Sequence, residues 1–210
     1  MKKASTPKSE QPTSIRKKRL ILDKSADLFY RKGYRSTSMR DIARACHFEA
    51  ANIYHYFSSK EQILYEVFRE AAEHTLSVIE NLEYSPEMSP GERLRCFVKR
   101  HFETPEPGTK PYYMMFDMEL KNLLPRHRRK IIEMRDEYDK ILRKIIQDGL
   151  DDGTFVTNDV KLAGYAIASI IVRSRLWFSP IGRLSAEEVA QFMSNFASNA
   201  LRKSTKDKPI

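Results

Sequence analysis

The chain has 210 residues and a formal net charge of +9, so it is longer than a small domain and too short for two large ones. Residues 1–60 hold 14 Lys/Arg and 5 Asp/Glu, whereas residues 61–210 hold 23 of each class. A basic module joined to a neutral body is typical of proteins that bind nucleic acid, because Lys and Arg release counterions from phosphates. A solvated basic tail is the alternative.

Cysteine usage and hydropathy exclude several other classes. Cys46 and Cys96 are the two cysteines and lack metal-ligand spacing, so neither a disulfide framework nor a metal site is predicted. The longest apolar run, residues 162–172, is too short to cross a bilayer, and no secretory segment follows the N-terminal lysines. We expect a soluble, cytoplasmic protein that needs no cofactor and does not enter a membrane.

The chain is predicted to be all-α, because strand signals are nearly absent while helix start and stop signals recur. Residues 1–13 and 203–210 are Lys-, Ser-, Thr- and Pro-containing segments without periodicity, so we expect a disordered basic tail and a disordered C-terminal tail. The expected helices cover residues 14–32, a short helix opened by Ser38, 49–56, a long helix opened by Ser58, 90–103, 111–120, 125–151, 159–178 and 185–202.

Local side-chain patterns predict where several of these helices begin and end. A Ser followed three residues later by Asp or Glu is the signature of a capping box. Gly33 suits the left-handed residue that ends the first helix. The predicted capping boxes are Ser38–Asp41, Ser58–Glu61, Ser89–Glu92 and Ser185–Glu188.

Three short N-terminal helices with a turn at residues 45–48 match a helix-turn-helix, whose last helix enters the major groove of DNA. Residues 33–43 (GYRSTSMRDIA) and 53–61 (IYHYFSSKE) resemble the N-terminal signature of the TetR family of transcriptional regulators. We therefore expect residues 14–60 to bind DNA and residues 61–202 to bind a ligand and dimerise. The resemblance implies that Ser38, Arg40, Tyr54, His55 and Lys60 hold the DNA backbone.

Base reading is expected from the first turn of the third helix. The amide of Asn52 can pair with adenine, and the methyls of Ala50 and Ala51 can touch thymine methyls. The sequence departs from the family pattern at His47, which replaces the usual turn glycine, and at residues 49–51. His tolerates positive φ, so the turn is expected to survive, but the departures leave the operator sequence unreadable. The residues expected at the bases are Glu49, Ala50, Ala51 and Asn52.

No catalytic residue is predicted. His55 has no nucleophile or orienting carboxylate at a spacing that implies a catalytic arrangement. The sequence also lacks paired carboxylates, a phosphate-binding loop and a metal cluster. The protein is therefore not expected to be an enzyme.

The helix over residues 159–178 is apolar almost all round and must be covered on both sides. A second subunit is the expected second cover, and burial within one subunit is the alternative. Together with the last helix it would form a four-helix interface, as the TetR resemblance also implies, and a homodimer implies a palindromic operator. The residues expected at this interface are Gly164, Ile167, Ala168, Ile171, Phe192 and Phe196.

Two features indicate an effector site in the body. Residues 112–116 (YYMMF) are typical of an adaptable apolar pocket, with core packing as the alternative. Arg173 and Trp177 stand one turn apart, and a buried Arg needs an anionic partner. That partner is either an anionic ligand or an internal carboxylate of Glu103, Asp117 or Glu119. The expected effector-binding residues are Tyr112, Tyr113, Phe116, Arg173 and Trp177.

Residues 176–188 resemble the C-terminal pattern of TetR regulators that respond to acyl-coenzyme A thioesters of lipid, steroid or aromatic catabolism. The sequence thus predicts a dimeric repressor that a small anionic, apolar effector releases from operator DNA. A constitutive dimeric DNA-binding protein without an effector is the alternative.

Overall fold

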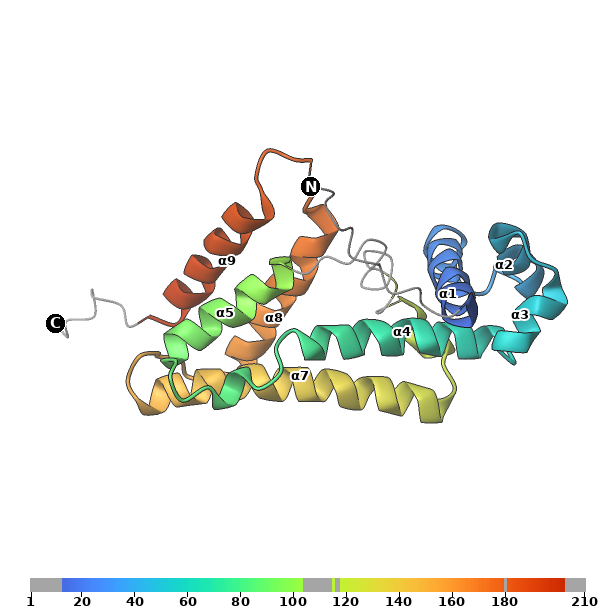
Figure 1. Cartoon of the computed structure of the whole chain (residues 1–210). Coiled ribbons are helices and arrows are strands. Elements are labelled where there is room, and N and C mark those ends of the chain that lie inside the picture. The colour runs from blue at the N-terminus through green and yellow to red at the C-terminus, as the bar shows by residue number, and fades with distance from the viewer. Residues whose placement is uncertain (1–12, 104–114, 116–117, 180, 203–210) are drawn as a thin grey trace, which may run out of the picture. The chain divides into compact units, whose positions relative to one another are not determined.

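The computed structural model describes residues 13–103, 115, 118–179 and 181–202 (Figure 1). Within these ranges the regular structure is helical and contains no strand, which confirms the all-α prediction. The chain divides into two compact units, Met1–Val67 and Phe68–Ile210. The helices are α1 (Thr13–Lys32), α2 (Met39–Cys46), α3 (Ala50–Tyr56), α4 (Lys60–Ser77), α5 (Pro90–Glu103), α7 (Pro125–Asp151), α8 (Val160–Trp177) and α9 (Ala186–Ala200), with short 3-10 turns at Leu82–Tyr84 and Leu120–Asn122.

The first unit contains α1, α2, α3 and the start of α4. Its two predicted chain reversals are confirmed, because Gly33 and His47 both adopt positive φ, 80° and 54°. The capping box at the start of α2 is also confirmed: Ser38 Oγ accepts from Asp41 N (3.1 Å), and the Asp41 carboxylate accepts from Ser38 N (2.9 Å). The helices enclose a small core of fully or nearly fully buried side chains, which includes Ile21, Leu22, Phe29, Ile42, Ile53, Phe57, Ile63 and Leu64.

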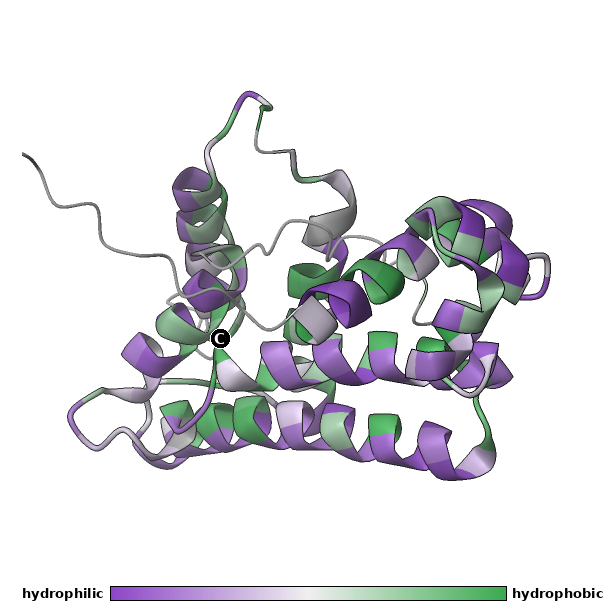
Figure 2. Ribbon diagram, turned by 45° about the vertical axis from the view of Figure 1, so that its right-hand side comes forward, coloured by the Kyte–Doolittle hydropathy of each residue, from purple (hydrophilic) through white to green (hydrophobic). Residues whose placement is uncertain are grey.

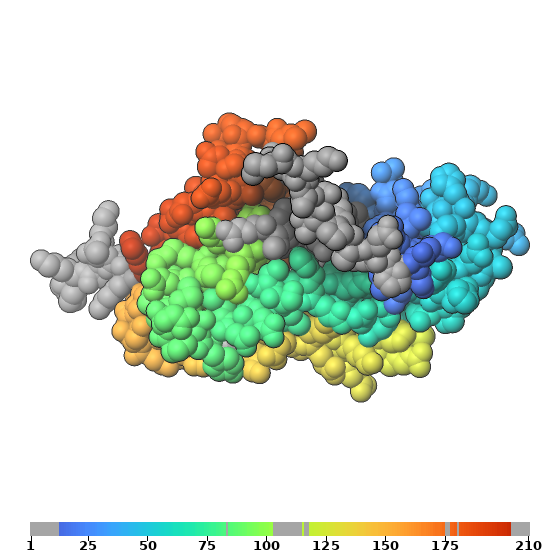
Figure 3. Space-filling model, viewed as in Figure 1, coloured from blue at the N-terminus to red at the C-terminus, as the bar shows by residue number. Residues whose placement is uncertain are grey.

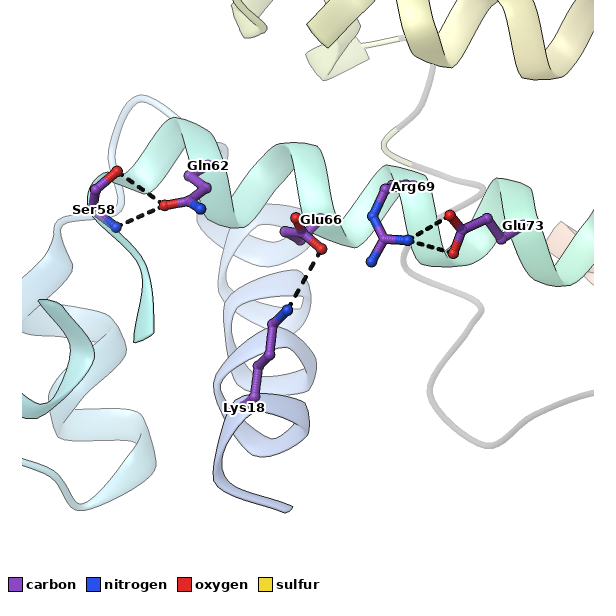
Figure 4. Close-up of polar contacts among 6 residues, drawn as sticks. All are labelled: Lys18, Ser58, Gln62, Glu66, Arg69 and Glu73. Atoms are coloured by element: carbon purple, nitrogen blue, oxygen red, sulfur yellow. Dashed lines mark hydrogen bonds and ion pairs between the residues drawn. The ribbon is translucent and has the colours of Figure 1, made fainter. Parts of the chain in front are cut away.

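The predicted Ser58–Glu61 capping box is wrong, because α4 begins at Lys60, two residues beyond Ser58. Ser59 Oγ accepts from Gln62 N (3.1 Å), and Gln62 Oε1 accepts from the backbone N (2.7 Å) and hydroxyl (2.9 Å) of Ser58 (Figure 4). Two adjacent serines offer the same capping chemistry in two registers, and the structure uses the second one.

The second unit contains the rest of α4 and the helices α5, α7, α8 and α9. Helix α5 packs against both α9 and α7, and α7 packs against α8. The α5–α9 contact is visible as adjoining green and red surfaces in Figure 3. The capping boxes at Ser89–Glu92 and Ser185–Glu188 form as predicted.

One polar contact between α5 and α7 lies inside this unit. Arg93 is 7% exposed, and its guanidinium donates to Asp148 at 2.9 Å. Burial alone would raise the pKa of Asp148, but hydrogen bonds from Lys144 and Arg93 lower it. A buried charge of this kind is tolerated because it is paired and hydrogen-bonded.

Helix α8 differs from α7 in the distribution of its apolar residues. Figure 2 shows polar and apolar segments alternating along α7, as expected for a helix with one solvent face. In α8 the inner side is buried at Ile167 and Ile171, yet the outer side is apolar too, with Leu162 64% and Ile170 37% exposed. Within the described part of the chain, the outer side of this apolar helix is therefore left exposed.

Most of the helix predicted over residues 111–120 lies outside the described residues. Among the helices that are described, none combines the length and the hydropathy needed to traverse a bilayer.

Candidate DNA-binding and effector-binding sites

The helix-turn-helix presents most of the predicted DNA-binding side chains to solvent. Arg40 on α2 and Asn52, Tyr54 and His55 on α3 are exposed, and α2 packs directly against α3. Ile53, between Asn52 and Tyr54, is fully buried and fixes the rotation of α3 about its axis. The buried side of α3 thus determines which of its side chains face outward.

The first turn of α3 also has an exposed edge. Glu49 and Ala51 are exposed and Ala50 is half-buried. Because both alanines carry only a methyl group, the start of α3 has little side-chain bulk. This edge suits close approach to a base pair.

Ser38 caps the start of α2. Its hydroxyl donates to Asp41 Oδ2 (2.6 Å) and accepts from Asp41 N (3.1 Å). These hydrogen bonds from the side chain and backbone of Ser38 lower the pKa of the Asp41 carboxyl. The predicted contact of Ser38 with a phosphate stays a prediction, and in the free protein this hydroxyl positions α2.

Lys60 was predicted to be a phosphate ligand, and the structure gives its ammonium group another set of partners. Its Nζ donates to the carbonyl oxygens of Thr37 (2.6 Å) and Tyr34 (2.8 Å) and lies 4.3 Å from the centre of the Tyr34 ring. An ammonium has three donors, and a third contact reaches Arg35 O at 3.5 Å. Lys60 therefore ties the start of α4 to the loop between α1 and α2, a role that no sequence pattern revealed because its acceptors are backbone carbonyls.

Other polar groups of this unit are structural. Lys18 on α1 pairs with Glu66 on α4 at 3.8 Å (Figure 4). Cys46 is buried, and burial raises the pKa of its thiol to about 11. The thiol is therefore protonated at neutral pH and is a poor nucleophile.

The predicted effector residues are placed only in part. Tyr112, Tyr113 and Phe116 lie outside the described residues. The side chains of Arg173 and Trp177 are exposed, Trp177 by 58%, so the expectation of a buried Arg is wrong. The reason is that both residues lie on the outer side of α8, which the described part of this protomer does not cover.

Both alternatives for the partner of Arg173, an anionic ligand and an internal carboxylate, stay predictions. Within the described part of the chain, Arg173 makes no hydrogen bond or ion pair. The carboxylate of Glu119 accepts from Asn122, and the side chains of Glu103 and Asp117 lie outside the described residues. The described residues thus provide no internal partner for Arg173.

Four of the six predicted interface residues lie inside the protomer. Ile167, Ala168 and Ile171 belong to the core of the second unit, and Gly164 is buried against Arg143 and Ile146 of α7. Ile167 and Ile171 nevertheless line the groove between α8 and α9, so the part that these four residues play at an interface stays a prediction. Helix periodicity could not separate the inner from the outer side, since both carry large apolar residues.

The outer faces of α8 and α9 form an apolar surface. Phe192 and Phe196 on α9 are 64% and 50% exposed, and their rings stack with centroids 6.5 Å apart. A groove of about 360 Å³ runs between the two helices. Its lining includes Leu162, Ala166, Ile170, Met193, Phe196 and Ala200.

Comparison with known proteins decides the family. Residues 87–201 match the tetracyclin repressor-like C-terminal domain, and residues 21–67 match the bacterial regulatory proteins of the tetR family. The chain belongs to the TetR family. It is a DNA-binding transcriptional regulator rather than an enzyme, as the sequence predicted.

Several TetR-family proteins are similar over most of their length. The transcriptional repressor KstR2 of Mycolicibacterium smegmatis is 31% identical over 183 residues, which cover 86% of this chain and 87% of that protein. The solved structure of PfmR from Thermus thermophilus is 35% identical, with a TM-score of 0.74 and coverage of 87% and 99%. AibR, solved with isovaleryl coenzyme A and operator DNA, shares the fold at 24% identity and a TM-score of 0.74, over 86% of this chain and 97% of AibR.

Proposed function

We propose that this TetR-family protein is a homodimeric repressor that a small anionic, apolar effector releases from a palindromic operator. The observation that carries the proposal is the pairing of two surfaces in one chain. The basic helix-turn-helix exposes Arg40, Asn52, Tyr54 and His55, and the body leaves one apolar face of α8 and α9 uncovered. The first surface suits DNA, and the second suits another copy of the chain.

On DNA, the exposed guanidinium of Arg40, the phenol of Tyr54 and the imidazole of His55 contact the phosphates. These contacts fix the position of α3 without reading sequence. Asn52 reads adenine from the major groove through its amide. Lys60 stabilises this surface indirectly, because it holds the loop that precedes α2.

The dimer forms through the outer faces of α8 and α9. Leu162, Ile170, Phe192 and Phe196 contribute exposed apolar area to this interface, in place of the four buried residues named from the sequence. Two symmetric copies then present two α3 helices to successive turns of the major groove, which gives affinity that one copy lacks.

The effector class we propose is an acyl-coenzyme A thioester. Its support is the exposed Arg173 and Trp177 pair, which offers a cation and a large apolar ring to an anionic ligand with an apolar part. The C-terminal resemblance to acyl-coenzyme A-responsive regulators agrees with it. AibR shows that this fold holds a coenzyme A thioester and DNA.

The test starts from an operator obtained by selection from random DNA. Acyl-coenzyme A thioesters of several chain lengths, free coenzyme A and free acids are then titrated into the protein–DNA complex while fluorescence anisotropy is recorded. We expect a thioester to weaken DNA binding, and by linkage the operator must weaken thioester binding by the same factor. If no compound changes DNA affinity, the protein is a constitutive DNA-binding protein.

Arg173→Ala tests the effector contact, with Arg135→Ala, an exposed cation on α7, as the matched control. Because Arg173 has no partner among the described residues, Arg173→Ala should melt like the wild type and bind operator normally. It should respond to thioester only at much higher concentration. A response equal to that of the wild type would remove Arg173 from the effector site.

A further inference from the structure

The carboxylates of the helix-turn-helix unit differ in whether they have a hydrogen-bond or ion-pair partner. Residues 13–60 contain four of them in an otherwise strongly basic segment. Within the described part of the chain, the side-chain carboxylate of Glu49 is the one among these four that makes no hydrogen bond or ion pair. The other three have partners: Arg19 with Asp23 (3.2 Å), Arg31 with Asp27 (2.8 Å), and Ser38 with Asp41 (2.9 Å from its backbone N).

Stabilisation of the start of α3 does not explain why residue 49 is a glutamate. It is the N-cap residue of α3 in an extended conformation (φ −69°, ψ 147°), and its side chain makes no capping hydrogen bond. Glu is not among the residues favoured at this position. By contrast, the N-cap residues of α2, α8 and α9 are Ser38, Asp159 and Ser185, whose side chains accept from backbone N–H groups of the first turn.

The position of Glu49 brings it into the proposed DNA contact. It is exposed, and its backbone carbonyl accepts from Asn52 N at 3.0 Å, so both residues lie together at the N-terminal end of the recognition helix. The residues between them, Ala50 and Ala51, carry only methyl groups and let this end of the helix approach the base edges. Phosphates repel a carboxylate, so the contact is favourable only if Glu49 accepts a hydrogen bond from a base.

We propose that Glu49 determines specificity by accepting a hydrogen bond from the N4 amine of a cytosine in the major groove, beside the adenine read by Asn52. Cytosine N4 is the donor that the carboxylates of Glu and Asp recognise there. The inference rests on the proposed function, in which α3 lies in the groove. Side chains three residues apart have Cβ atoms about 5–6 Å apart, and bases rise about 3.4 Å per step, so the two bases lie one or two steps apart.

Binding-site selection from random DNA tests the proposal, with the full-length wild type, Glu49→Ala and Asp27→Ala. The control Asp27→Ala removes one carboxylate on α1 and so makes the same change in net charge. The wild type should select a palindrome with a cytosine one or two steps from an adenine in each half-site. Glu49→Ala should keep the palindrome and lose that cytosine preference, by roughly 5- to 150-fold in competition binding, while Asp27→Ala should keep it.

Two results would overturn the assignment of Glu49. One is a cytosine preference that Glu49→Ala retains at full strength. The other is an equal rise in affinity for all sequences in Glu49→Ala and Asp27→Ala. That result would mean that Glu49 affects DNA binding only through its contribution to the net charge. A wild type that selects no sequence at all would count against the proposed function instead, so the two failures are distinguishable.

Discussion

At the scale of single residues, Lys60 shows how a side chain on the DNA-binding unit can act within the protein. Hydrogen bonds to charged groups contribute about 1.5–3 kcal/mol, and Lys60 Nζ makes two short ones to loop carbonyls. Lys60→Met should therefore lower the free energy of unfolding by about that amount, measured by urea denaturation. The control Lys24→Met, at an exposed position on α1, should change it little.

DNA binding by the same variants separates the two roles of Lys60. If the ammonium acts through the loop, Lys60→Arg should restore much of the stability and the affinity together. A Lys60→Met protein that unfolds like the wild type but binds every DNA more weakly would instead make Lys60 a phosphate ligand only.

Gly149 lies so close to a neighbouring ring that no larger residue fits at this position. A Cβ at this position would lie 2.0 Å from the ring of Phe155, which is itself buried. Gly149→Ala should therefore destabilise the body by about 1–3 kcal/mol through overpacking, although Ala favours helix formation. Gly91→Ala, where the nearest atoms lie 3.8 Å from the new Cβ, should be neutral or stabilising in the same thermal melts. Equal melting temperatures for both variants would contradict this packing argument.

At the scale of elements, the capping boxes at the helix starts make the stability of the fold depend on pH. Hydrogen bonds from the serine partners lower the pKa of Asp41 and Glu92, and hydrogen bonds from Ser185 lower that of Glu188. Because the folded values lie below the ordinary ones of 3.8 and 4.5, the stabilisation is complete above about pH 5 and is lost as the pH falls through the folded values.

The measurement is the melting temperature between pH 3 and pH 7. The wild type should lose stability on acidification, and Ser185→Ala should start lower at pH 7 and lose less, because its Glu188 no longer has the serine hydroxyl as donor. An unchanged pH profile in Ser185→Ala would show that this capping box contributes nothing to the acid response.

The elements also show what the sequence could predict. Helix starts at Ser38, Ser89 and Ser185 depend on side chains three residues apart, so a local pattern suffices. At α4 two adjacent serines allow two registers, and the pattern selects the wrong one. In α8 exposed polar residues such as Lys161 and Arg173 are interspersed with exposed apolar ones, so only packing against α7 shows that Gly164 and Ile171 face inward. The roles of Arg40, Glu49, Asn52 and Arg173 toward DNA or effector stay predictions.

At the scale of the whole molecule, the uncovered face of α8 and α9 leads to a test of the dimer. Ile170→Glu combined with Phe192→Glu would place carboxylates in an apolar interface, and symmetry would double their number. Both residues are exposed in the protomer, so the variant should keep its helical content and sediment as a monomer. It should also bind a palindromic operator far more weakly, because one copy reaches one half-site.

Two controls complete this experiment. Tyr84→Glu changes another exposed apolar residue, away from α8 and α9, and should leave the dimer intact. Ile171→Glu changes the inner side of α8, where burial of an unpaired carboxylate should unfold the body instead of only separating the subunits. A double variant that stays dimeric, while Ile171→Glu stays folded and becomes monomeric, would mean that the inner side of α8 forms the interface and that the orientation of this helix is reversed.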